Sequence, residues 1–230
     1  MATMIGQPDR SSDRPGRAAG ARPRRPALFG PAVMDTFLGE PDPAQRIEAA
    51  HLTAAALVDH GRSGNDPKLT ARLVALADDH GLDEIAELWA ARPAPTLPGA
   101  LWRVYALRAG IRRDPAGMAR AFDNGRHRAP VHEAVAGVAE PPGPHEVQDL
   151  ADAILAGAFT GDLAVALERA AAFCHVVATG WAVQADDVVE LGTEVDAQPG
   201  AGLTRQAAGL ARTGTELEDA ARRWRIGELS

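Results

Sequence analysis

The sequence predicts an all-α protein: a compact multi-helix bundle of antiparallel helical hairpins with a C-terminal coiled-coil-like helix. Three observations support this fold class. Alanine and leucine dominate a hydrophobic fraction of 46%, whereas aromatic residues make up only 4%, and alanine is the best helix former but a poor strand former. Helix start signals recur along the chain. Apolar residues recur every three or four positions, which is the helical period.

The start signals are aspartates that precede prolines. Asp42-Pro43, Asp66-Pro67 and Asp114-Pro115 each place an N-cap acceptor before a proline at the first helical position, where its missing N–H costs nothing. Two stop signals follow the first two starts. In both Asp59-His60-Gly61 and Asp79-His80-Gly81 a histidine occupies the last turn and a glycine lies just past it, so we expect helices to end there.

Apolar stripes extend the helical prediction along the chain. The long stripe from Leu163 to Trp181 is apolar nearly all round, so we expect this helix at the centre of the bundle. Further stripes predict helices at 47–58, 69–77, 85–89, 97–111, 118–122, 131–138 and 144–155.

Composition divides the chain into four parts. Residues 1–33, rich in Arg, Pro, Gly and Ser, are expected to be a disordered basic tail. Either this tail touches nucleic acid or acidic lipid, or it is an artefact of the start site, because Met34 opens the organised part. Residues 34–182 are expected to form the helical bundle domain. Residues 183–202 read as an acidic segment and linker, with the linker at 198–202, and residues 203–226 as a C-terminal amphipathic helix.

The C-terminal helix has the most regular pattern in the chain. Its apolar and small residues alternate in steps of four and three, which is the seam of a coiled coil. This seam packs on the parent bundle or grips another chain, including a second copy of the same protein. It consists of Leu203, Ala207, Leu210, Gly214, Leu217, Ala221 and Trp224.

The sequence lacks the motifs that several kinds of catalysis require. Lys68 is the only lysine and follows Pro67, so a P-loop is excluded. Cys174 is the only cysteine and lies in an apolar stripe, where a thiol is usually inert. Ser63 lacks the Gly-x-Ser-x-Gly elbow of a serine hydrolase. We therefore expect no enzyme, no catalytic residue and no cofactor. The lone cysteine and the lack of a run of about 18 apolar residues favour the cytoplasm.

Metal ligands at recognisable spacing are also lacking. Glu48 and His51 have the i, i+3 spacing of a di-metal carboxylate bundle, but no second copy occurs, and such a site needs two. His127 and His132 flank a proline and lack carboxylates at ligand spacing. The sequence therefore predicts no metal ligands.

The charges are distributed unevenly. Residues 100–129 carry seven arginines and two acids, whereas residues 140–200 carry eleven acids and one base, Arg169. Two interpretations remain open. Either the basic and acidic helices neutralise one another, or the basic surface meets an acidic protein or a phosphate.

The helix expected at 97–111 carries two informative side chains. Arg108 falls inside its apolar stripe, where an arginine should pair with a carboxylate or line a pocket. Trp102 points the other way. If exposed, Trp102 with Arg103 and Arg113 has the composition of a protein-binding hot spot; if buried, the helix is another central one.

Three segments, 97–103, 137–144 and 159–169, resemble an actinobacteria-restricted helical family. It is the family of ParJ, a regulator of ParA polymerisation in chromosome segregation. The resemblance covers roughly residues 36–182. It implies a non-enzymatic regulator that binds a ParA-type ATPase.

We therefore expect a non-enzymatic protein-interaction module. The alternative is a small-molecule- or metal-binding bundle, with a pocket lined by Arg108, Glu48 and His51. Nucleic-acid binding is disfavoured because the domain is acidic and no recognition motif occurs. The residues expected to bind the partner are Trp102, Arg103, Arg108, Arg113, Leu210, Leu217 and Trp224.

Overall fold

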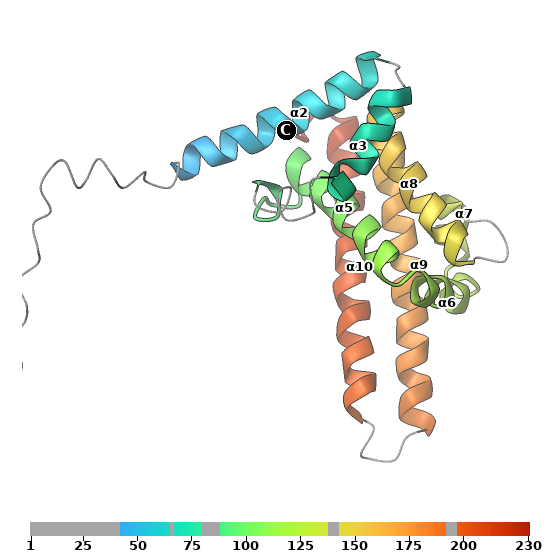
Figure 1. Cartoon of the computed structure of the whole chain (residues 1–230). Coiled ribbons are helices and arrows are strands. Elements are labelled where there is room, and N and C mark those ends of the chain that lie inside the picture. Colours follow the sequence, from blue (N-terminus) through green and yellow to red (C-terminus); the bar gives the residue numbers. More distant parts are fainter. Residues whose placement is uncertain (1–41, 65–66, 80–87, 138–142, 192–196) are drawn as a thin grey trace, which may run out of the picture. The chain divides into compact units, whose positions relative to one another are not determined.

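The computed structural model describes residues 42–64, 67–79, 88–137, 143–191 and 197–230 (Figure 1). Residues Pro41–Ser230 form one compact unit, which includes the C-terminal helix. Within the described ranges the chain forms packed α-helices and no strand, so the all-α prediction is confirmed. The predicted basic tail lies outside these ranges. The helices are α2 (Pro43–Gly64), α3 (Pro67–Asp79), α5 (Leu97–Arg113), α6 (Pro115–Arg126), α7 (Pro130–Ala136), α8 (Pro144–Thr160), α9 (Leu163–Leu191) and α10 (Ala197–Arg225).

The predicted N-caps are present wherever the structure describes them. A carboxylate oxygen of Asp42 accepts a hydrogen bond from the Ala44 amide at 3.0 Å. Asp114 accepts one from the Gly117 amide at 2.8 Å, which satisfies a donor that the first turn of α6 leaves unpaired. The third predicted cap, Asp66, lies outside the described residues.

The stop signal at Gly61 is wrong, because α2 continues to Gly64. Gly61 is buried within the helix, and a Cβ added there would lie 2.8 Å from Cβ of Phe159. The glycine therefore permits close packing of α2 on α8 instead of ending α2. The other stop is partly described: α3 ends at Asp79, and Gly81 lies outside the described residues.

The long helix α9 contacts α5, α6, α7, α8 and α10, as expected of a helix that is apolar nearly all round. Phe173 of α9 stacks on Phe122 of α6 with ring centroids 5.4 Å apart. By length and composition alone, residues Leu163–Asp187 would also suffice to cross a membrane, but 72% of the most apolar window is buried inside the unit. A buried core helix accounts for this composition.

Helices α6 and α9 cross at backbone contact. A Cβ added at Gly180 of α9 would overlap the carbonyl oxygen of Ala121, and one added at Gly125 of α6 would overlap that of Val176. Only glycine fits at these two positions. The crossing fixes the end of α6 on α9 and thereby the start of α7, which follows four residues later.

Helix α10 runs antiparallel to α9, as Figure 1 shows. Arg225, at the end of α10, pairs with Glu168 near the start of α9. Glu218 pairs with His175 about two turns further in on each helix. The seam residues Ala207, Gly214, Leu217 and Ala221 are buried. Of the two alternatives for the seam, the structure has it packed on its own chain.

Residues 183–191 and 197–202 are helical, which differs from the prediction for this part of the chain. α9 extends to Leu191 and α10 begins at Ala197, whereas the sequence predicts an acidic segment and a linker over 183–202. Pro199 is the third residue of α10, and the amides of the first helical turn need no partner within the helix. A proline there marks the start of a helix rather than a linker.

The chain end returns to α5 (Figure 1). Gly227 adopts φ +73°, and the amides of Gly227 and Glu228 donate to the carbonyls of Trp224 and Arg223, which is the Schellman pattern of a helix end. Leu229 is then buried. The carbonyl of Ser230 accepts a hydrogen bond from the amide of Leu97 at 3.0 Å, at the first residue of α5.

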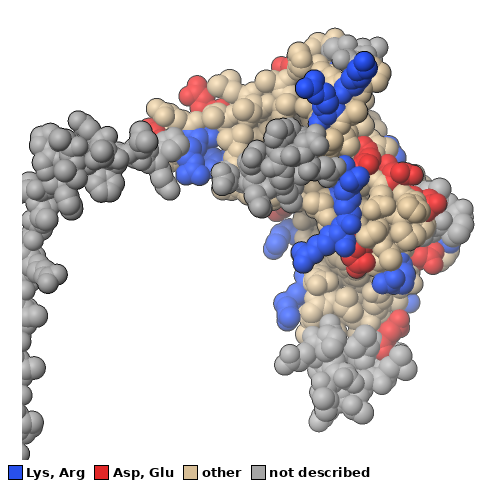
Figure 2. All heavy atoms as spheres, viewed as in Figure 1, with Lys and Arg blue, Asp and Glu red and all other residues tan. Residues whose placement is uncertain are grey.

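Basic and acidic side chains lie beside one another over the middle of the face in Figure 2. Asp152 of α8 pairs with Arg108 at 2.6 Å and with Arg112 at 3.7 Å. Arg103 pairs with Glu216 of α10 at 2.6 Å. These pairs favour mutual neutralisation for part of the arginine-rich helices.

Candidate functional site

A cleft of about 370 Å³ lies between α5 and α10. Its large apolar lining side chains are Trp102 and Leu107 of α5, Leu210 of α10 and Met118 of α6. Trp102, Met118 and Leu210 are half-buried and pack against the core, so each presents its remaining surface to the cleft. The volume lies within the range of pockets that hold a small ligand or a large side chain.

Charged groups stand on the rim of this cleft. Nε of Arg103 lies 2.6 Å from a carboxylate oxygen of Glu216, and its Nη1 donates to the carbonyl of Gly99 at 2.8 Å. These bonds hold the Arg103 side chain in place. Arg212 lines the same cleft from α10 and is exposed. With two arginines and one carboxylate, the charged rim is net positive.

The other residues predicted to bind a partner lie elsewhere. Arg108 is buried and paired with Asp152, which confirms the expected carboxylate pairing. Arg113 is exposed at the end of α5. Leu217 is fully buried. The Trp224 ring is half-buried, with the Arg62 guanidinium 5.5 Å from its centroid. The Arg108–Asp152 pair, the Arg62–Trp224 contact and the burial of Leu217 all lie within the chain.

A second cleft, of about 480 Å³, lies between α3 and α8 and is lined mainly by apolar groups, with Asp152 at its edge. Neither cleft is lined by Glu48 or His51. On α2, Glu48 is exposed and His51 is half-buried. The alternative hypothesis, a small-molecule- or metal-binding bundle, places a pocket at Glu48, His51 and Arg108. That pocket does not coincide with either cleft.

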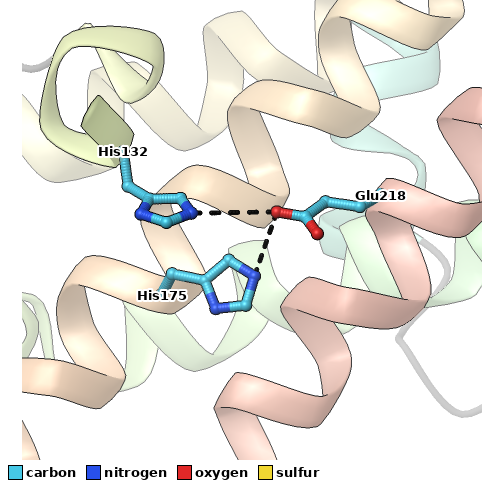
Figure 3. A group of neighbouring side chains, drawn as sticks. All are labelled: His132, His175 and Glu218. Atoms are coloured by element: carbon cyan, nitrogen blue, oxygen red, sulfur yellow. Dashed lines mark ion pairs between the residues drawn. The ribbon is translucent and has the colours of Figure 1, made fainter.

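Three polar side chains that line neither cleft converge on one another, as Figure 3 shows. Nε2 of His175 (α9) lies 3.2 Å from Oε1 of Glu218 (α10), and Nε2 of His132 (α7) lies 3.8 Å from the same oxygen. The two imidazole rings are 4.8 Å apart between centroids. Gly214 makes room for the His175 ring, because a Cβ there would lie 2.8 Å from Nε2 of His175.

Burial lowers the pKa of His175, and the Glu218 carboxylate opposes this shift. Of these three residues only His132 stands out in the sequence, as a histidine close to a proline, and no pattern points to His175 or Glu218. These residues stand on three helices far apart in the chain, so no local spacing connects them. The nearest feature in the sequence is Gly214, the one glycine in the seam.

No family model matches this chain, and neither a curated protein nor a solved structure matches it.

Proposed function

We propose that this chain is a non-enzymatic, cytoplasmic protein-interaction module that binds its partner in the cleft between α5 and α10. In this proposal the fold is a compact bundle of antiparallel helical hairpins, and the coiled-coil-like α10 supplies one wall of the cleft. One observation carries it. Trp102, Arg103 and Leu210, which the sequence singles out separately as partner-binding residues, line the same cleft.

The lining defines the chemistry of the partner. A half-buried tryptophan beside leucine and methionine side chains favours an apolar anchor residue, since buried aromatic contacts dominate binding energy at protein interfaces. The arginines on the rim, Arg103 and Arg212, favour carboxylates on either side of that anchor. The partner segment is therefore acidic and carries one large apolar side chain.

The resemblance to the ParJ family supplies one specific partner, a ParA-type ATPase. This choice rests on the resemblance alone, whereas the acidic and apolar character of the partner rests on the cleft.

The test is a binding titration with a purified ParA-type ATPase from the same genome, beside an acidic peptide that carries a single leucine. Trp102→Ala removes the aromatic wall, and Arg212→Glu reverses an exposed rim charge. We expect each variant to weaken binding by about tenfold or more, the range of interface hot spots. Circular dichroism first establishes that both variants are as helical as wild type.

Arg120→Glu is the matched control. Arg120 is exposed on α6 and does not line the cleft, yet its reversal changes the net charge by the same amount as Arg212→Glu. Binding of this variant should stay within about twofold of wild type. Equal losses in both reversals would reduce the effect to overall charge and reject the cleft. If the peptide binds but the ATPase does not, the ATPase is the wrong partner.

A further inference from the structure

We propose that His132, His175 and Glu218 form a binding site for a divalent transition-metal ion of the zinc class. The proposal is independent of the partner-binding cleft. It starts from the donor set. Two neutral imidazoles and one carboxylate are ligands that Zn²⁺ takes in proteins, and they leave a fourth position open.

The geometry is close to what a metal needs. Donor atoms bound to a tetrahedral zinc ion at about 2.0–2.2 Å lie about 3.3–3.6 Å from one another. Here the two imidazole nitrogens lie 3.2 and 3.8 Å from Oε1 of Glu218, and one donor atom from each residue lies within 4.8 Å of the others. Small side-chain rotations bring the three donors to ligand distance.

The position is built by the packing of the helices. His175 occupies space that Gly214 leaves open on α10, and Glu218 lies one helical turn further along the same helix, so its carboxylate reaches the imidazole. His132 is carried by α7, which contacts α9. Donors held on packed helices are better oriented than donors on loops.

The site also has a route for an ion. The His132 side chain is 41% exposed, whereas that of His175 is 20% exposed, so the group opens to solvent on the α7 side. A bound ion would join α7, α9 and α10 through a single centre. Because metal binding to a folded site stabilises the folded state, the ion would clamp α7 onto the two long helices.

The experiment is a titration of the full chain, free of any histidine tag and dialysed against a chelator, with Zn²⁺ and with Co²⁺. Calorimetry gives stoichiometry and affinity, and the visible spectrum of Co²⁺ reports ligand number and symmetry. We expect one ion per monomer with a dissociation constant below about 10 μM. His132→Ala and Glu218→Gln should each weaken binding by more than about tenfold and alter the Co²⁺ spectrum.

His145→Ala is the control, because His145 is an exposed histidine on α8 outside the group. Its affinity should match wild type. Weak binding by wild type, or equal binding by wild type and His132→Ala, would overturn the proposal. So would a stoichiometry of one ion per two chains, which indicates bridging through surface histidines. If Glu218→Gln fails to fold, the affinity of His132→Ala alone decides the outcome, because the His132 side chain is half-exposed and its loss should not disturb folding.

Discussion

Burial controls the chemistry of the chain's one thiol. Cys174 is fully buried in α9, and desolvation raises its pKa to about 12, since the apolar surroundings disfavour the thiolate. The same burial leaves the group inert as a nucleophile. The sequence predicts this from the position of Cys174 in an apolar stripe.

We expect the Cys174 thiol to be resistant to a disulfide reagent such as dithionitrobenzoate in the folded protein. Labelling should proceed only through unfolding, so its rate should rise steeply with urea, following the fraction unfolded. The measurement is the labelling rate across a urea series beside circular dichroism. Labelling in water at the rate of a free thiol would show that α9 is not the buried helix described here.

Arg108 shows how far one residue can be interpreted from sequence. Its place in an apolar stripe predicts either a carboxylate partner or a place in the lining of a pocket, and in the structure it pairs with Asp152. The identity of that partner depends on the packing of α5 against α8, which the pattern of neither helix contains. Trp102 is similar: it is neither exposed nor buried, because α10 covers only part of it.

Elements were predicted well where local physics decides them. Aspartate caps and prolines gave the starts of α2 and α6, because capping satisfies amides within one turn. The role of a glycine in a helix is harder to predict from sequence. Gly61 looks like a stop signal but serves a helix contact with Phe159, and a glycine that ends a helix has the same appearance in sequence as one that lets another helix approach.

The crossing of α6 and α9 makes a prediction about glycine. Gly180→Ala should destabilise the protein by about 1–3 kcal/mol, since the added methyl group overlaps the backbone of α6 and overpacking costs this much. The comparison is the midpoint of urea unfolding for wild type and variant.

Gly209→Ala is the matched control on α10, where an added Cβ meets nothing within 4 Å. The same change there should stabilise the protein by about 0.5–1 kcal/mol, because alanine is the better helix former. If both substitutions shift the midpoint in the same direction, the close crossing is not present in solution.

For the molecule as a whole, the pairing of α9 with α10 sets a sensitivity to acid. Nη2 of Arg225 donates a hydrogen bond to Oε2 of Glu168 at 2.7 Å. The hydrogen bonding and positive charge of the Arg225 guanidinium lower the pKa of Glu168. A carboxyl group whose pKa is lowered on folding stabilises the fold above its ordinary pKa of about 4.3. That stabilisation is lost as the pH falls through the lowered value.

We expect Arg225→Gln to lower the urea midpoint at pH 7. Its effect should become progressively smaller as the pH falls from about 4 through the lowered pKa of Glu168, below which Glu168 is protonated in both states. Unfolding at a series of pH values, at constant ionic strength, measures this. A difference between wild type and variant that is the same at pH 3 and pH 7 would assign the effect of Arg225 to packing rather than charge.

Neither candidate site follows from the sequence as a whole. Trp102, Arg103 and Leu210 were identified one by one, but the cleft exists only because α10 lies at a particular distance from α5. His175 and Glu218 were not identified at all, because their meeting depends on the antiparallel register of α9 and α10. The residue spacing within one helix does not show how that helix is aligned with another.

The return of the chain end to α5 has a practical consequence for every experiment above. Leu229 is buried, and the carbonyl of Ser230 accepts a hydrogen bond from the amide of Leu97. Leu97 is the first residue of α5 and lies five residues before Trp102. An affinity tag or fluorophore fused directly to Ser230 would press on the helix that forms a wall of the cleft. Immobilisation through this end therefore needs a flexible glycine–serine spacer. Without one, a weakened interaction would report the label and not the protein.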